Sequence, residues 1–234
     1  MEVAIQIIAR VRSDFPNKFG IPRQSGLVPE LMARVVFEPE FRNPDMLRGL
    51  EGFSHVWLLW NFSGSRQSGW SPTVRPPRLG GNQRMGVFAT RSPFRPNPIG
   101  LSCVKLEQVL PQSPDGPVLV VSGADLMDGT PIFDIKPYIS YADCRPDAVC
   151  GFTDTAGDFL LEVNFPPGLL AKIPEGSREA LTGVLAHDPR PAYQHDPERI
   201  YGLTFGGFNI RFRVVENVLT VCCVDDAEWH AASI

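Results

Sequence analysis

Hydrophobic and polar positions alternate over short runs in the first 140 residues, which is the pattern of half-buried β-strands. Together with short continuous apolar stretches, these runs predict about seven strands, at residues 3–11, 31–37, 54–62, 86–90, 100–110, 117–122 and 132–138. Asn43-Pro44, a cap residue followed by a proline suited to the first helical position, predicts one short helix ending near Gly49 or Gly52. Strands without crossover helices favour an antiparallel barrel or sandwich over a parallel α/β sheet.

The pattern weakens from Ser140 to Asp158, where we expect the boundary between a barrel domain (1–140) and a small C-terminal domain (141–234). Strands are predicted there at residues 159–165, 208–215 and 218–224. Ser177 is a suitable N-cap for a helix that continues to His187, and Glu216-Asn217 is suited to a two-residue hairpin turn. The expected fold class is mainly β: an antiparallel barrel or sandwich with a smaller α+β C-terminal domain.

The composition indicates a loop-rich globular protein, because the 234 residues include 23 Pro and 21 Gly. The five cysteines contain no C-x-x-C pair, which suits a reduced, cytoplasmic protein without a zinc site. The four histidines do not pair at metal-ligand spacing, so no metal is expected. The N-terminus lacks the basic region of a signal peptide, and no apolar run approaches the ~18 residues of a membrane span.

The charges are unevenly distributed along the chain. Although it has 22 basic and 26 acidic residues, no Asp or Glu occurs between Glu51 and Glu107. This interval contains the basic residues Arg66, Arg75, Arg78, Arg84, Arg91, Arg95 and Lys105. A basic block in an acidic chain creates a local positive field. It predicts a polyanionic partner, with nucleic acid as the first candidate.

Within this block, residues 84–103 place Arg91 and Arg95 among Pro93, Pro96 and Pro98. Prolines fix φ and make such a loop stiff and extended, so its guanidiniums are presented at defined positions. Guanidiniums suit phosphates and carboxylates, although the loop can also be a proline-rich turn with solvated arginines. Because no G-x-G-x-x-G motif is present, a nucleotide cofactor would have to be held by loops.

Two further loops are candidates for binding. Asp128-Gly129-Thr130 is either a simple hairpin corner or a corner whose amides and carboxylate hold a polar cofactor. In the loop 188–193, Arg190 and Tyr193 can stack on an unpaired base or can pack the small domain onto the barrel.

Seven segments together resemble a known family. They are FGIPRQSG, FSHVWLLWNF, RPPRLGG, MGVFATRSPFRPNPIGLS, DGTPIFDIKPY, DPRPAY and FNIRF. They are similar to the motifs of the TrmO (YaeB/TsaA-like) family of S-adenosylmethionine-dependent tRNA methyltransferases, over essentially the whole chain. The resemblance implies a small closed β-barrel catalytic domain, a smaller C-terminal domain and a homodimer. The implied reaction methylates N6 of N6-threonylcarbamoyladenosine, 3′ of the anticodon in threonine tRNA.

The resemblance also implies site residues. Those expected to bind S-adenosylmethionine are Arg23, Gln24, Ser25, Gly64, Ser65, Arg91, Leu101, Asp125, Leu126, Met127, Asp128, Gly129 and Thr130. Those expected to face tRNA are Lys18, Arg75, Arg78, Arg84, Arg95, Arg190, Tyr193 and Arg211.

Methyl transfer from a sulfonium is an in-line displacement, which positioning alone can accelerate strongly. If a general base exists, Asp134 or Tyr138 are candidates, and Arg95 or Arg23 could clamp the threonyl carboxylate. Two other classes of protein also fit the basic block. One is a non-catalytic RNA-binding barrel, and the other is an enzyme that acts on a small anionic metabolite.

Overall fold

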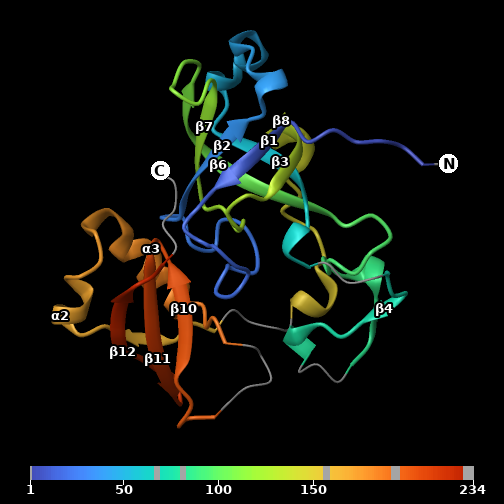
Figure 1. Ribbon diagram of the computed structural model, residues 1–234. Coiled ribbons are helices and arrows are strands. Elements are labelled where there is room, and N and C mark those ends of the chain that lie inside the picture. The colour runs from blue at the N-terminus through green and yellow to red at the C-terminus, as the bar shows by residue number, and fades with distance from the viewer. Residues whose placement is uncertain (1, 66–68, 80–82, 155–158, 191–195, 229–234) are drawn as a thin grey trace.

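A computed structural model describes residues 2–65, 69–79, 83–154, 159–190 and 196–228. Six strands close into an antiparallel barrel in the order β1-β2-β7-β6-β3-β8, seen at the top of Figure 1. These strands are β1 (Ala9–Arg12), β2 (Met32–Phe37), β3 (His55–Asn61), β6 (Ile99–Leu110), β7 (Val118–Ser122) and β8 (Pro131–Pro137). The expected closed antiparallel barrel is thus confirmed.

The barrel forms because its strands bury every second side chain. In β2, Ala33, Val35 and Phe37 are almost fully buried, and the residues between them are more exposed. β1 closes the barrel by pairing with β2 on one side and with the start of β8 on the other. The alternation predicted from the sequence therefore corresponds to an inward apolar face and an outward face along each strand.

Short turns and one small hairpin connect the barrel strands. The 3₁₀ turns are η1 (Pro39–Phe41), η2 (Pro44–Leu47), η3 (Leu50–Gly52), η4 (Ser63–Ser65), η5 (Pro77–Leu79) and η6 (Val87–Ala89). Asn43 caps η2 by accepting a hydrogen bond from the Asp45 amide, as its sequence position predicts. β4 (Thr73–Val74) pairs with β5 (Met85–Gly86). The strand expected at residues 86–90 is wrong, because the chain turns there in η6.

The C-terminal domain has a four-stranded sheet in the order β10-β11-β12-β9. Its elements are β9 (Glu162–Asn164), α2 (Pro167–Leu170), α3 (Glu175–Ala186), β10 (Tyr201–Phe205), β11 (Phe208–Val215) and β12 (Val218–Asp226), preceded by α1 (Ser140–Asp143) and η7 (Gly151–Thr153). The predicted hairpin turn is present, since Val215 pairs with Val218 and Glu216 has a positive φ of 52°.

Several expected elements differ from the structure, and the strand expected at residues 159–165 is confined to Glu162–Asn164. The first strand begins at Ala9 rather than residue 3, and Val3 and Ile5 lie exposed beyond the barrel. Ser177 is not the N-cap of α3, because Glu175 already begins the helix after Pro174. β10 was not predicted, although Tyr201, Leu203 and Phe205 are buried, because its alternation directly follows a long polar run.

The loop between β1 and β2 joins the two domains. Phe15, Val28 and Leu31 come from this loop, yet they are buried in the hydrophobic core of the C-terminal domain. Gly20 lies against this core with a φ of +85°, and a Cβ there would come within 2.3 Å of a Leu203 methyl carbon. The loop therefore has a fixed position relative to both domains.

Candidate active site

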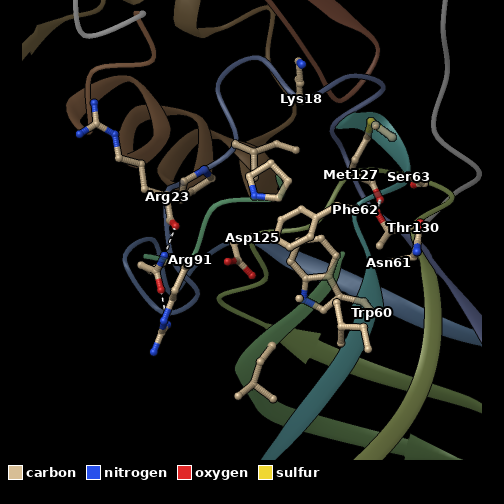
Figure 2. A pocket seen from close by; sticks show the side chains of 18 of the residues that line it. Lys18, Arg23, Trp60, Asn61, Phe62, Ser63, Arg91, Asp125, Met127 and Thr130 are labelled. Carbon is tan, nitrogen blue, oxygen red and sulfur yellow. Dashed lines mark hydrogen bonds between the residues drawn. The ribbon is translucent and has the colours of Figure 1, made fainter. Parts of the chain in front are cut away.

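A cavity of about 460 Å³ opens where this loop meets one end of the barrel. Its volume is in the range of small-molecule sites. It is lined by Lys18, Ile21, Pro22, Arg23, Gln24, Trp60, Asn61, Phe62, Ser63, Gly64, Thr90, Arg91, Pro93, Arg95, Ile99, Gly100, Leu101, Asp125, Met127 and Thr130. These residues come from four separate stretches of the chain, and Figure 2 shows most of their side chains.

Aromatic rings form one wall of the cavity. The rings of Trp60 and Phe62 have centroids 4.3 Å apart, at the end of β3 and just beyond it. Gly100 of β6 lies opposite Trp60, and a Cβ at Gly100 would come within 2.2 Å of the indole ring. A glycine at this position therefore allows the indole to lie flat against β6.

A hydrogen-bonded chain runs from this wall to Asp125. The Trp60 indole Nε1 donates to Ser102 Oγ over 3.0 Å, and Ser102 Oγ donates to Asp125 Oδ1 over 2.6 Å. In Figure 2 the Asp125 carboxylate lies between the aromatic rings and Arg91. Burial raises the pKa of the Asp125 carboxyl, whereas the Ser102 hydrogen bond, the Arg91 charge and the Ser25 amide lower it. The net shift of this pKa is upward.

Two loops meet at the rim of the cavity. The Arg91 guanidinium donates to Gln24 Oε1, and the Gln24 amide nitrogen donates to the Arg23 carbonyl. These contacts tie the proline-rich loop to the segment between β1 and β2. Arg91, one of the two arginines that the sequence singled out, therefore lies on the same cavity as Asp125.

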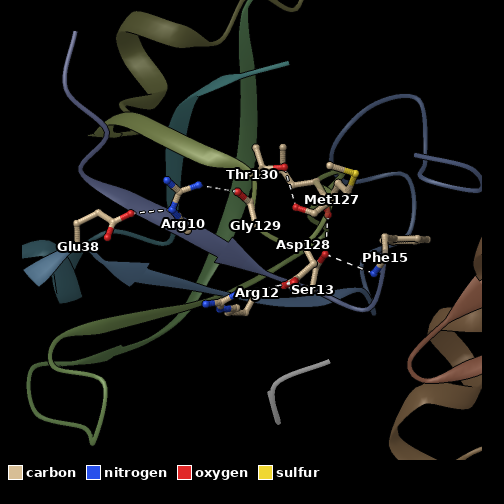
Figure 3. A network of polar contacts seen from close by, with 10 residues as sticks. Arg10, Arg12, Ser13, Phe15, Glu38, Met127, Asp128, Gly129 and Thr130 are labelled. Atoms are coloured by element: carbon tan, nitrogen blue, oxygen red, sulfur yellow. Dashed lines mark hydrogen bonds and ion pairs between the residues drawn. The ribbon is translucent and has the colours of Figure 1, made fainter. Parts of the chain in front are cut away.

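The corner formed by Asp128, Gly129 and Thr130 is held by contacts between Asp128 and β1 with the residue that follows it. Asp128 Oδ1 accepts from the Ser13 amide over 3.2 Å, and Oδ2 lies 3.6 Å from an Arg12 guanidinium nitrogen (Figure 3). Ser13 Oγ also donates to the Leu126 carbonyl over 2.7 Å. Since the Asp128 side chain points to β1 rather than into the cavity, the corner fixes the neighbouring residues that do line it.

The expected cofactor residues are thus only partly brought together. Those that line the cavity are Arg23, Gln24, Gly64, Arg91, Leu101, Asp125, Met127 and Thr130. Leu126 is buried in the barrel core, and Asp128 and Gly129 form the corner. Ser25 contributes its amide to Asp125. The side chain of Ser65 lies outside the described part of the structure.

The two residues suggested as general bases do not line the cavity. Asp134 bonds to Lys136 Nζ over 2.8 Å on the barrel wall. The Tyr138 amide donates to the His55 carbonyl, at the opposite end of β3 from Trp60. Five strand positions, or about 16 Å, separate His55 from Trp60, so Tyr138 lies far from the aromatic wall. Asp134 instead pairs with Leu59, the neighbour of Trp60. Neither residue is among the described residues that line the cavity.

The arginines of the basic block surround the cavity and the adjoining surface. Arg95 donates to the Thr90 carbonyl over 2.8 Å, and its guanidinium lies 5.8 Å from the centroid of the Phe88 ring. Phe88 is 77% exposed, which is unusual for a phenylalanine. Arg84 donates to Thr73 on the β4–β5 hairpin, and Arg75 is exposed nearby. Sequence reasoning did not single out Phe88, because nothing in its pattern shows that the ring faces solvent.

The remaining tRNA candidates lie in different surroundings. Arg190 is only 9% exposed, and its Nε and Nη2 bond to Asp188 at 2.8 and 2.9 Å, so it stabilises its own loop. Arg211 is exposed and pairs with Asp225 on the C-terminal sheet. Lys18 is exposed at the cavity. The Arg78 side chain and Tyr193 lie outside the described residues.

Neither a metal centre nor a membrane span is found in the described part of the chain. No group of three or more His, Cys, Asp or Glu side chains is placed there to bind an ion. No helix among the described residues combines the length and apolar character needed to cross a bilayer.

Comparison with known proteins gives the class of this protein. Residues 10–144 match the tRNA-methyltransferase O N-terminal domain, and residues 159–227 match the TrmO C-terminal domain. The protein is therefore a tRNA methyltransferase whose N-terminal domain is a β-barrel. The chain belongs to the TrmO family.

Individual relatives agree with this assignment. A tRNA (adenine(37)-N6)-methyltransferase of Escherichia coli is 43% identical over 217 residues, covering 89% of this chain and 92% of that protein. A putative S-adenosylmethionine-dependent methyltransferase of Pseudomonas aeruginosa is 40% identical over 228 residues, covering 91% and 93%. A crystal structure of TrmO from Pseudomonas aeruginosa has a TM-score of 0.75 at 33% identity, covering 96% of this chain and all of that one.

Proposed function

We propose that this chain transfers a methyl group from S-adenosylmethionine to N6 of adenosine 37 in tRNA. We further propose that the acceptor is the N6-threonylcarbamoyl form of this adenosine, in threonine tRNA. The observation that carries the proposal is the cavity, in which an aromatic wall, one carboxylate and a rim of cations meet. The names of the relatives support a methyltransferase over a non-catalytic RNA-binding barrel or a metabolite enzyme.

The residues present fit the methyl donor. S-adenosylmethionine supplies a methyl group on a cationic sulfonium. The faces of Trp60 and Phe62 are suited to stacking an adenine ring and to a nearby cation. The polar groups at the rim, from Arg23, Gln24 and Arg91, are suited to a carboxylate. Met127 and Leu101 add apolar contacts to the same cavity.

The surface around the cavity mouth suits a single-stranded RNA loop. Exposed aromatic rings stack on bases, and nearby cations bind the backbone. Phe88 and Arg95 offer this combination beside the cavity, and Trp70 on the same connection is 57% exposed. Lys18, Arg75 and Arg84 extend the cationic surface.

The threonyl carboxylate would be read by an arginine in the cavity. Arg95 is fixed by its bonds to the Thr90 and Ser92 carbonyls, and Arg23 is exposed at the rim. Either guanidinium can pair with a carboxylate. This arrangement predicts that RNA without the threonylcarbamoyl group is a poor substrate.

We also propose that the active form is a cytoplasmic homodimer, with a domain boundary near residue 140. The matched N-terminal family domain ends at residue 144 and the C-terminal one begins at residue 159, which supports this boundary. Light scattering of the purified protein at micromolar concentration tests the dimer. A monomeric mass would reject it.

Methyl incorporation into two anticodon stem-loops tests the proposed function. One stem-loop carries N6-threonylcarbamoyladenosine at position 37 and the other carries adenosine. We expect labelled methyl only in the first, and loss of labelling when the donor is omitted. No incorporation into either RNA, or equal rates on both, would contradict the proposal.

A further inference from the structure

We propose that Asp125 is the catalytic base of this methyl transfer, and that Ser102 is the residue that positions it. The inference rests on the proposed function and goes beyond it, since it assigns the proton acceptor. The carboxylate would accept the N6 proton of the target adenosine. This role differs from cofactor binding, which was the role expected for Asp125 from the sequence.

Asp125 has a unique chemical character among the described residues that line the cavity. It is the one carboxylate among them, and no histidine, cysteine or tyrosine is present there. The other ionisable side chains on this wall are Lys18, Arg23, Arg91 and Arg95, which are cationic. In the part of the cavity that the structure describes, a proton acceptor with a negative charge is therefore found only at Asp125.

The hydrogen bonds around Asp125 hold it in one orientation. Because Ser102 Oγ accepts from the Trp60 indole at 3.0 Å, its own proton is directed to Asp125 at 2.6 Å. Ser102 is 1% exposed, so this geometry is protected from water. A carboxylate has about four lone-pair sites, so it can accept a further proton while these bonds persist.

The environment also adjusts the basicity of Asp125. Burial raises the pKa of its carboxyl, which makes the carboxylate a stronger base than an exposed one. The Ser102 hydrogen bond and the charge of Arg91 act in the opposite direction. An acceptor nitrogen between an adenine ring and a carbonyl is more acidic than a simple amine, so a moderately basic carboxylate is sufficient.

The step balances in atoms and charge. The N6–H bond breaks, and its proton goes to an Asp125 oxygen. The bond between N6 and the methyl carbon forms while the carbon–sulfur bond breaks, and its electron pair stays on sulfur. A sulfonium and a carboxylate are replaced by a neutral thioether and a neutral carboxyl. The carboxyl then releases its proton to solvent at the cavity mouth.

Asp125→Asn tests the base directly, since it keeps the shape and the acceptor for Ser102 but is not basic. Single-turnover methylation at saturating donor and RNA should fall by about 100-fold or more, the size of general base catalysis. The dissociation constant of S-adenosylmethionine, measured by calorimetry, should change less than about threefold. Asp147→Asn, in the exposed segment after α1, is the matched control and should keep the wild-type rate.

Ser102→Ala tests the positioning independently. Removing a hydrogen bond that lowers the pKa of Asp125 should move the acidic limb of the pH–rate profile to higher pH. The carboxyl carbon signal of Asp125, followed by NMR without donor or RNA, should titrate at higher pH in this variant too. Because this variant retains the carboxylate, its pH–rate profile tests the role of Asp125 even if Asp125→Asn does not fold.

Two outcomes would overturn the inference. In the first, Asp125→Asn weakens donor binding tenfold or more but keeps the rate at saturation, which makes Asp125 a cofactor ligand. In the second, the pH profile is the same in the wild type and in Ser102→Ala. If the wild type itself methylates neither RNA, the proposed function fails, and that result is distinct from a failure of the Asp125 assignment.

Discussion

Phe15 and Phe205 meet edge to face, with ring centroids 5.2 Å apart and planes at 71°. Phe15 lies in the loop that lines the cavity, and Phe205 belongs to β10 of the C-terminal domain. This contact anchors the cavity loop in a core that is separate from the barrel. The position of the cavity therefore depends on both domains.

Phe15→Ala should destabilise the protein strongly, because Phe15 is 1% exposed. Truncation of a buried phenylalanine costs about 3–5 kcal/mol. Urea unfolding should show this loss in the free energy of unfolding. Phe88→Ala is the matched control, because Phe88 is 77% exposed and its loss should change stability by less than about 0.5 kcal/mol. Equal effects of the two substitutions would contradict the anchoring role.

Phe88→Ala should instead weaken RNA binding. Loss of one base–aromatic stack costs about 1–3 kcal/mol, or about 5- to 150-fold in affinity. Fluorescence anisotropy with a labelled anticodon stem-loop measures this, and donor binding should be unchanged. Phe159→Ala, which removes a ring that is 62% exposed in the segment before β9, should leave RNA affinity as in the wild type. Unchanged RNA binding by Phe88→Ala would remove Phe88 from the RNA surface.

Gly100→Ala should displace the Trp60 indole, because a Cβ would come within 2.2 Å of the ring. Overpacking of this kind costs about 1–3 kcal/mol. We expect the affinity for S-adenosylmethionine to fall tenfold or more by calorimetry. Gly52→Ala is the control, because a Cβ there meets no atom within 4 Å. Wild-type affinity in Gly100→Ala would show that the indole does not form the donor site.

Asp14 makes stability depend on pH. Burial, and secondly the charge of Asp128, raise its pKa from 3.8 to about 6. The protonated carboxyl therefore contributes stability that is fully present below about pH 4 and is lost as the pH rises through about 6. Each pKa unit is worth about 1.4 kcal/mol, and because the group is partly exposed we expect a total of about 1 to 3 kcal/mol.

Asp14→Asn should remove this pH dependence. The variant should be more stable than the wild type near pH 7.5, and the difference should disappear below about pH 4. Thermal unfolding across this pH range measures the stability of the wild type and of the variant, with Asp147→Asn as the exposed control. A variant that is less stable than the wild type near pH 7.5 would contradict the assignment.

The barrel was predictable because each strand carries its own local signal. The alternation in β2 and in β11 follows directly from one buried face. The proposed role of Asp125 as a base was not predictable in this way. Asp134 lies in β8 and Tyr138 directly follows it, and their sequence positions alone do not show that neither residue is among those that line the cavity.

The chain of hydrogen bonds from Trp60 through Ser102 to Asp125 also could not be predicted from the sequence. The three residues come from β3, from β6 and from the segment after β7, and only closure of the barrel brings them together. The sequence offers one signal, a polar residue at an inward position of β6, and that signal does not identify its partner. Asp128 showed a clear turn signal, yet its carboxylate binds Ser13 instead of facing the cavity.

Calorimetric titration of S-adenosylmethionine tests the central claim that this cavity holds the methyl donor. The titration compares the wild type with Arg91→Ala at the cavity rim and Arg48→Ala on the exposed surface of the barrel domain. Loss of one hydrogen bond to a charged group costs about 1.5–3 kcal/mol, so Arg91→Ala should raise the dissociation constant by about tenfold or more. Arg48→Ala should bind like the wild type. Equal binding by all three proteins, or no binding by the wild type, would contradict the claim.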